Sequence, residues 1–179
     1  MTSPLENLTG TGKPLAVEPT DMAEFEGLLR SGRARLVDAR NASLALESRF
    51  DLAYNAAHAL CLAALRRKGY RARHRYVVFQ ALPHTLGLGP EVWRVLDKCH
   101  HMRNVAEYEG ALDVDERIVT DLVAACETVV KTLDKLIQAR CMRLPDLLTE
   151  KVSGWRAAGY AYDVSPAIAK ILAWLAGAR

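Results

Sequence analysis

The sequence predicts an all-α fold, a bundle of five to seven helices, and three observations favour it. Half of the 179 residues are hydrophobic but only 7% are aromatic, and Ala and Leu dominate the apolar set. These side chains lose little conformational freedom in a helix. Apolar residues recur at spacings of three and four along most of the chain, whereas no two segments pair convincingly as strands. The expected helices cover residues 22–37, 44–68, 76–82, 91–109, 115–140, 147–160 and 165–179.

Capping residues and breakers set the expected helix ends. Thr20 or Asp21 can cap the first helix, and Asn41 or Ser43 can cap the second. Gly69 follows three cations and is a typical C-terminal cap, with positive charge on the negative end of the helix dipole. Pro90 suits the first turn of the fourth helix.

We expect three segments along the chain. Residues 1–17 are rich in Thr, Gly, Pro and Ser and poor in large apolar side chains, which is typical of a flexible tail. Residues 18–140 form the helical bundle, and residues 141–179 form a helical C-terminal extension.

Several classes of function are disfavoured. No apolar run is long enough to cross a bilayer, and the first residues lack a basic start and an apolar core, so we expect a soluble, cytoplasmic protein without membrane contact. The four cysteines form no CxxC pair, and no HExxH spacing occurs, so we expect no metal site and no cofactor. His58 has apolar neighbours and is expected to be a half-buried core residue.

Charge is unevenly distributed. Residues 52–90 contain no Asp or Glu, and the basic segment RRKGYRARHR contributes six cations: Arg66, Arg67, Lys68, Arg71, Arg73 and Arg75. A positive patch attracts polyanions such as RNA, and Tyr70 and Tyr76 are available to stack on bases. The alternatives are a solvated helix end or a surface that docks on an acidic partner or on the acidic residues 107–127 of a second copy.

The segment CHHMRNVAEYEG, residues 99–110, is the main candidate site. On a helix His100 lies beside Arg103 and Asn104, so one face offers an imidazole, a guanidinium and an amide. Such a set suits a phosphodiester, because arginine binds phosphate oxygens, the amide orients them and histidine carries a proton. The alternative is an exposed helix face on which Arg103 pairs with Glu107.

Two helices carry a family resemblance. The Ala-rich helix RFDLAYNAAHALCLAALRRKGYR, followed by a helix that ends in CHHMRNVAEYEG, resembles the HEPN superfamily of small helical bundles over residues 43–138. The resemblance implies an up-and-down helical bundle, RNA or nucleotides as ligands, and a homodimer. It also implies a toxin–antitoxin or defence setting, with an antitoxin or a nucleotidyltransferase as partner.

Active members of that family resemble metal-independent ribonucleases with arginine, a polar residue and then histidine. Arg103 and Asn104 match the first two positions, and Tyr108 stands at the histidine position. Three hypotheses follow. The chain is a divergent ribonuclease in which His100 or Tyr108 carries the proton, a binding module for RNA or nucleotides, or a structural protein whose Arg103 bridges to a carboxylate across a dimer interface.

Overall fold

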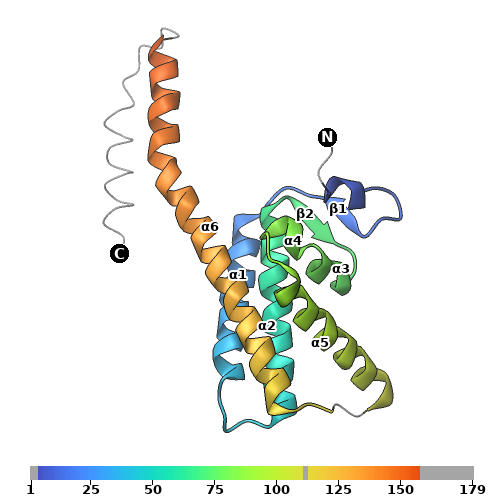
Figure 1. Ribbon diagram of the computed structural model, residues 1–179. Coiled ribbons are helices and arrows are strands. Elements are labelled where there is room, and N and C mark those ends of the chain that lie inside the picture. Colours follow the sequence, from blue (N-terminus) through green and yellow to red (C-terminus); the bar gives the residue numbers. More distant parts are fainter. Residues whose placement is uncertain (1–3, 111–112, 158–179) are drawn as a thin grey trace. The chain divides into compact units, whose positions relative to one another are not determined.

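The computed structural model describes residues 4–110 and 113–157, and of residues 140–157 it describes only the helical backbone. The chain divides into two units, residues 1–133 and 134–179. The described part is mostly helical, which confirms the all-α prediction (Figure 1). The elements in chain order are η1 (Glu6–Leu8), β1 (Leu15–Val17), α1 (Met22–Ala39), α2 (Leu46–Arg67), β2 (Tyr70–Ala72), α3 (Arg75–Gln80), α4 (Leu82–Thr85), α5 (Pro90–Glu109) and α6 (Glu116–Ala157).

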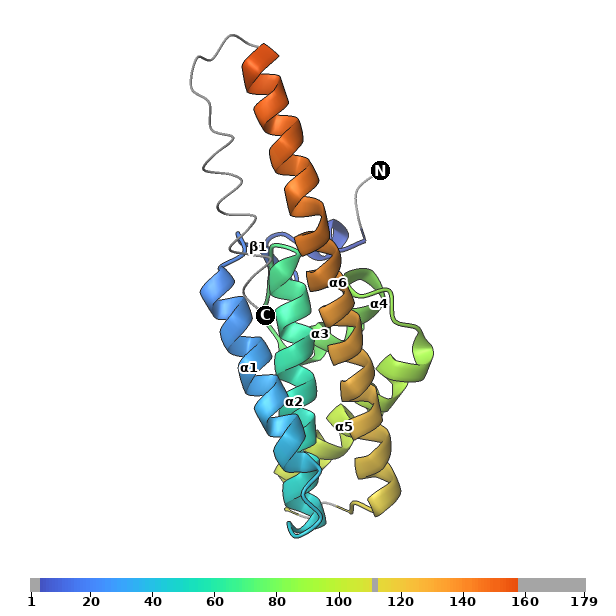
Figure 2. The ribbon, with the colours of Figure 1, turned by 90° about the vertical axis from the view of Figure 1, so that its left-hand side faces the viewer.

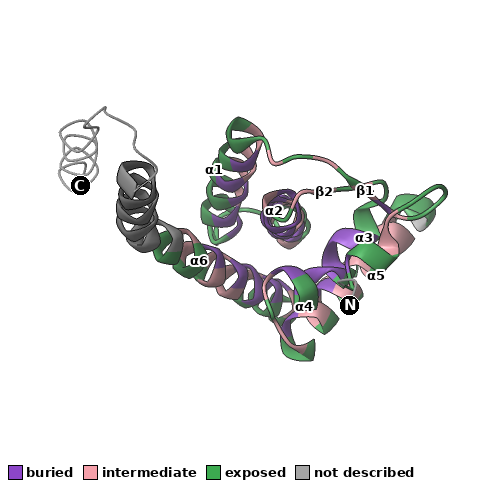
Figure 3. Ribbon diagram, turned by 90° about the horizontal axis from the view of Figure 1, so that it is seen from above, coloured by how far each residue is buried: buried purple, intermediate pink, exposed green. Residues whose placement is uncertain are grey.

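Helix α2 is the central element of the first unit. Seen end-on, it is surrounded by α1, the first part of α6 and the segment α3–α5 (Figure 3). Its small residues, among them Ala53, Ala56, Ala57 and Ala63, are fully buried. The wide apolar surface of this helix is therefore covered within one chain.

Helix α1 packs closely along α2 because Gly32 has no side chain. A Cβ atom at Gly32 would lie only 2.7 Å from Cγ of Leu60. Asp21 caps α1 as predicted, because its carboxylate accepts hydrogen bonds from the backbone N–H groups of Ala23 and Glu24. The close approach of these helices removes Phe25, Leu29 and Leu36 from water.

The first turns of α6 close the other side of α2, and α1, α2 and α6 lie side by side in this region (Figure 2). The Cys126 thiol donates to the Ala53 carbonyl at 3.4 Å. Arg49 on α2 reaches the Glu116 carboxylate at 2.8 Å, and Arg40 after α1 reaches Glu127 at 2.6 Å. The acidic segment therefore supplies ion pairs that fix α6 to the bundle.

The N-terminal segment differs from the prediction. Residues 1–17 were expected to be flexible, but β1 pairs antiparallel with β2, with Ala16 opposite Arg71. Leu5 and Leu15 are buried. Two strands of three residues are too short to give an alternating pattern in the sequence, and their pairing depends on residues more than fifty positions apart.

The start of α2 and the end of α6 also differ from the prediction. Neither Asn41 nor Ser43 caps α2, since the Asn41 carboxamide accepts from the Ser43 backbone N–H within the loop and the helix begins at Leu46. Helix α6 continues across the expected boundary at residue 140 and through Pro145. Most of the helix expected at 147–160 is thus part of α6, and the one expected at 165–179 lies outside the described residues.

Candidate functional site

A pocket of about 400 Å³ lies along one face of α5. Asp97, His100, His101 and Asn104 line it, and Tyr76 reaches it from α3. The four α5 residues share a face because they are spaced by three, one and three positions. The pocket thus collects the polar residues of the segment that the sequence singled out.

The His100 imidazole is held on three sides. The Tyr54 hydroxyl lies 2.7 Å from its Nδ1, and the Asn104 carboxamide nitrogen lies 3.0 Å from its Nε2. The Tyr76 ring stacks on it at 5.1 Å between centroids and 19° between planes. Helices α2, α3 and α5 therefore fix both the position and the plane of this ring.

His100 is neutral near pH 7. Burial lowers its pKa below the ordinary value, and the positive charges of Arg103 and Arg75 lower it further against the raising effect of Asp97. A neutral imidazole has one donor and one acceptor. When the Asn104 amide N–H donates to Nε2, the imidazole proton resides on Nδ1 and is donated to the Tyr54 oxygen. When the Asn104 amide is rotated so that its oxygen faces Nε2, the directions of both hydrogen bonds are reversed.

Two further groups around this ring are kept neutral by burial. Tyr54 is fully buried, and burial raises its pKa against the lowering effect of Arg103 and Arg75. Burial also lowers the pKa of His58 to about 4. His58 is half-buried against the Phe79 ring, as predicted.

Arg103 lies beside the pocket with its donors only partly used. Its Nη1 atom is 2.5 Å from the Glu107 carboxylate, and its Nε atom is 3.9 Å from that of Asp51. The guanidinium carbon lies 5.1 Å from the centre of the Tyr54 ring, which is a cation–π contact. The Nε atom is buried and has no hydrogen-bond partner in the described part of the chain.

The structure brings His100, Arg103 and Asn104 together, but it leaves Tyr108 apart. Tyr108 is 90% exposed and does not line the pocket. Asp97 was not among the predicted site residues, although it lies one helical turn before His100 and the spacing could have indicated it. Tyr54 comes from another helix, and no local pattern connects it with His100.

The basic segment, residues 66–75, has fewer cations accessible to RNA than the sequence suggested. Arg66 was predicted to face RNA, but its side chain is only 1% exposed. It donates to the Glu24 carboxylate at 2.9 Å, to the Glu18 carboxylate at 3.1 Å and to the Pro19 carbonyl at 3.1 Å. The prediction is wrong for Arg66, because carboxylates from a distant part of the chain surround it.

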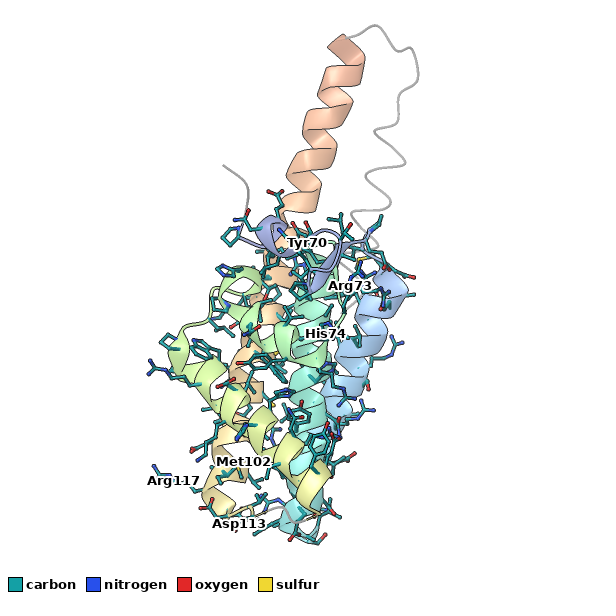
Figure 4. The ribbon with its side chains drawn as sticks, turned by 90° about the vertical axis from the view of Figure 1, so that its right-hand side faces the viewer. Tyr70, Arg73, His74, Met102, Asp113 and Arg117 are labelled. Atoms are coloured by element: carbon teal, nitrogen blue, oxygen red, sulfur yellow. The ribbon has the colours of Figure 1, made fainter. Side chains whose placement is uncertain are left out.

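The other cations of the segment differ in their pairing. Arg71 is bound by the same carboxylates, at 2.6 Å from Glu18 and 3.1 Å from Glu24. Lys68, Arg73 and Arg75 are exposed and Arg67 is partly buried. Arg73 lies at the opposite end of the first unit from Asp113 (Figure 4). It borders a second pocket with the glycine-rich loop of residues 9–12.

Residues 4–110 and 113–157 contain neither a metal-binding cluster nor a helix suited to crossing a membrane. No cluster of three His, Cys, Asp or Glu side chains there is arranged to hold a metal ion. No helix among these residues is both long and apolar enough to cross a bilayer. Cys61, Cys99 and Cys126 are buried thiols, and burial raises the pKa of Cys99 to about 12, so these thiols stay protonated. The side chain of Cys141 lies outside the described part.

No protein-family model, curated protein or solved structure matches the chain.

Proposed function

We propose that this chain is a HEPN-like module that binds RNA or a ribonucleotide in the α5 pocket beside Arg103. The observation that carries the proposal is the partly exposed guanidinium of Arg103, which lies one turn after His100 and directly before Asn104 on the helix that lines the polar pocket. The side chain is 23% exposed, so an anion has access to it from solvent. Phosphate is the ligand that a forked arginine and a nearby amide bind best.

Binding requires one local exchange. The phosphate takes the place of the Glu107 carboxylate at Nη1, because Glu107 is 52% exposed and can turn into water at small cost. The exposed cations Lys68, Arg73 and Arg75 extend the positive surface of the same unit and attract the rest of an RNA chain. Arg66 is excluded from this role because its side chain is buried among carboxylates, and Arg71 adds little positive charge because Glu18 and Glu24 neutralise it.

Cleavage of the bound RNA is a second candidate, favoured by the neutral state of His100. A neutral imidazole at the pocket can take the proton of a ribose 2′-OH while the 2′-oxygen attacks phosphorus. The bond from phosphorus to the 5′-oxygen then breaks, and that oxygen takes up a proton that exposed His101 relays from solvent, while His100 afterwards releases its proton to water. The products are a 2′,3′-cyclic phosphate and a 5′-hydroxyl. Asn104 must first release Nε2, where it bonds in the free protein.

The first test measures binding of a fluorescent single-stranded RNA at several salt concentrations. We expect Arg103→Ala to weaken RNA binding about tenfold or more. The slope of the logarithm of the binding constant against the logarithm of the salt concentration should also fall, by roughly the contribution of one phosphate contact. Arg30→Ala is the matched control, because Arg30 also forms an exposed pair with a glutamate four residues away. Equal binding by wild type and Arg103→Ala would overturn the proposal.

The second test separates binding from cleavage. Total RNA and transfer RNA are incubated with wild type, Arg103→Ala and His100→Gln in EDTA, and the ends of any products are analysed. Cyclic phosphate ends that disappear in His100→Gln support cleavage. Intact RNA that still binds the wild type identifies a binding module and removes the ribonuclease.

The resemblance also implies a homodimer and a partner protein such as an antitoxin or a nucleotidyltransferase, which we keep as part of the proposal. Light scattering of the purified chain across a concentration series tests the dimer. A monomer at all concentrations, with RNA binding intact, would restrict the proposal to a single-chain site.

A further inference from the structure

The two ends of the α5 pocket differ in charge. Asp97 lies at one end and the neutral Asn104 at the other, and Arg103, directly before Asn104 in α5, is paired with Glu107 outside the pocket lining. Asn104 lies seven positions after Asp97, which corresponds to about 10 Å along the helix axis. That length is comparable to the distance from the phosphate of a nucleotide to the far edge of its base.

The negative end also has an aromatic wall of fixed orientation. The Tyr76 hydroxyl donates to Oδ1 of Asp97 at 2.7 Å, and its ring stacks on His100. Hydrogen bonding to Asp97 raises the pKa of Tyr76, which keeps the hydroxyl protonated and the contact intact. The Tyr76 residue is still 38% exposed, so part of it remains available to a planar ligand.

We propose that the pocket holds one nucleotide unit of the bound RNA, with its phosphate at Arg103 and Asn104 and its base at Tyr76 and Asp97, and that Asp97 selects guanine. This inference rests on the proposed function and names the base that the same site prefers. The carboxylate of Asp97 repels a phosphate group, which sets the direction in which the nucleotide lies.

The preference for guanine follows from the chemistry of a carboxylate. An ionised carboxylate only accepts hydrogen bonds, and its two oxygens offer about four acceptor positions, of which Tyr76 uses one. Guanine presents two adjacent donors, N1–H and N2–H, on one edge. Adenine and cytosine present a single amino group. Uracil presents one N–H between two carbonyl oxygens that repel the carboxylate, so we expect it to bind most weakly.

The experiment measures the dissociation constants of GMP, AMP, CMP and UMP by calorimetry. For wild type we expect GMP to bind about tenfold more tightly than UMP, with AMP and CMP between them. Asp97→Asn keeps an oxygen acceptor for Tyr76 but loses the carboxylate, so the difference between GMP and UMP should shrink to about twofold or less. Asp38→Asn, an exposed carboxylate at the end of α1, is the control for the change in net charge and should keep the wild-type ranking.

The outcomes separate this inference from the proposed function. If the four nucleotides bind wild type equally, or if Asp97→Asn keeps the guanine preference, the inference is overturned. If Arg103→Ala weakens the binding of all four nucleotides in either case, the proposed function is still supported. If wild type binds neither the nucleotides nor single-stranded RNA, both fail. The ranking in wild type needs no variant, so it decides the question even if Asp97→Asn does not fold.

Discussion

Two arginines of this chain, Arg66 and Arg103, look alike in the sequence and differ in the structure. Each lies on a helix and each has two carboxylates nearby. Arg66 is enclosed and donates from Nε and Nη2 to carboxylates and a carbonyl at 2.9–3.1 Å. Arg103 is 23% exposed, and its Nε–H has no acceptor among the described residues.

The difference shows how burial and hydrogen bonding divide structural from functional cations. A buried guanidinium with its donors engaged holds two chain segments together and has no capacity left for a ligand. A guanidinium that is 23% exposed and paired with an exposed glutamate can exchange that partner for a ligand. We therefore expect changes at Arg66 to act on stability, and changes at Arg103 to act on binding.

The largest expected effect is at Arg66. Arg66→Met leaves Glu18 and Glu24 without their buried partner, and we expect the free energy of unfolding to fall by about 3–5 kcal/mol. Urea unfolding followed by circular dichroism measures it. Arg71→Met is the control, because Arg71 is 44% exposed and its loss should cost about 1 kcal/mol or less. Similar losses in both variants would remove the distinction between the buried and the exposed cation.

A pH effect of similar size is expected at His58, which packs against Phe79. The pKa of His58 is about 4 in the fold and about 6.5 in the unfolded chain, so between these values the unfolded state binds the additional proton. Stability therefore falls as the pH drops from 6.5 to 4, by roughly 3 kcal/mol in total from this group.

Urea unfolding at pH 7, 5.5 and 4 tests this expectation. His58→Gln should be less sensitive to pH than wild type across this window, whereas His84→Gln, at an exposed histidine, should follow wild type. A His58→Gln curve parallel to wild type would show that burial does not hold the imidazole neutral.

A smaller effect is expected at Tyr54. Tyr54→Phe removes the hydroxyl that lies 2.7 Å from Nδ1 of His100 and leaves that nitrogen without its partner, which should cost about 1–2 kcal/mol. Nitrogen NMR of the imidazole should also show a changed tautomer population. Tyr108→Phe is the matched control at a 90% exposed ring and should change neither quantity.

The smallest loss of stability is expected at Arg103 itself. Arg103→Ala removes an ion pair spaced by four residues and a cation–π contact, together about 1 kcal/mol. Thermal unfolding measures this quantity beside the RNA-binding assay. If Arg103→Ala lowers the free energy of unfolding as much as Arg66→Met does, Arg103 has a structural role and its proposed role in binding is contradicted.

The helices could be predicted from local patterns, and the contacts between them could not. The spacing of apolar residues placed α1, α2 and α5 within a few positions, and Gly69 marked a helix end, where its backbone φ is 82°. Periodicity reports only which face of a segment is buried. It does not say which distant segment covers that face.

Part of the candidate site could likewise be predicted from local spacing, and part of it could not. The cluster of His100, Arg103 and Asn104 was predicted because all three lie on one helix, where spacing alone brings them together. The Tyr54 hydroxyl and the carboxylates around Arg66 belong to other segments, so no count along the chain could find them. The absence of acidic residues from 52 to 90 therefore overstated the free positive charge of that region.

The pairing of β1 with β2 also has a consequence during synthesis of the chain. Strand β1 ends at Val17, and its partner is complete only at Ala72, 55 residues later. At ordinary rates of translation, the ribosome needs roughly 3 to 10 seconds to add that length. During this interval Leu5 and Leu15, which are buried in the finished fold, have no place to pack. These two apolar side chains therefore stay exposed in the growing chain until β2 has been synthesised.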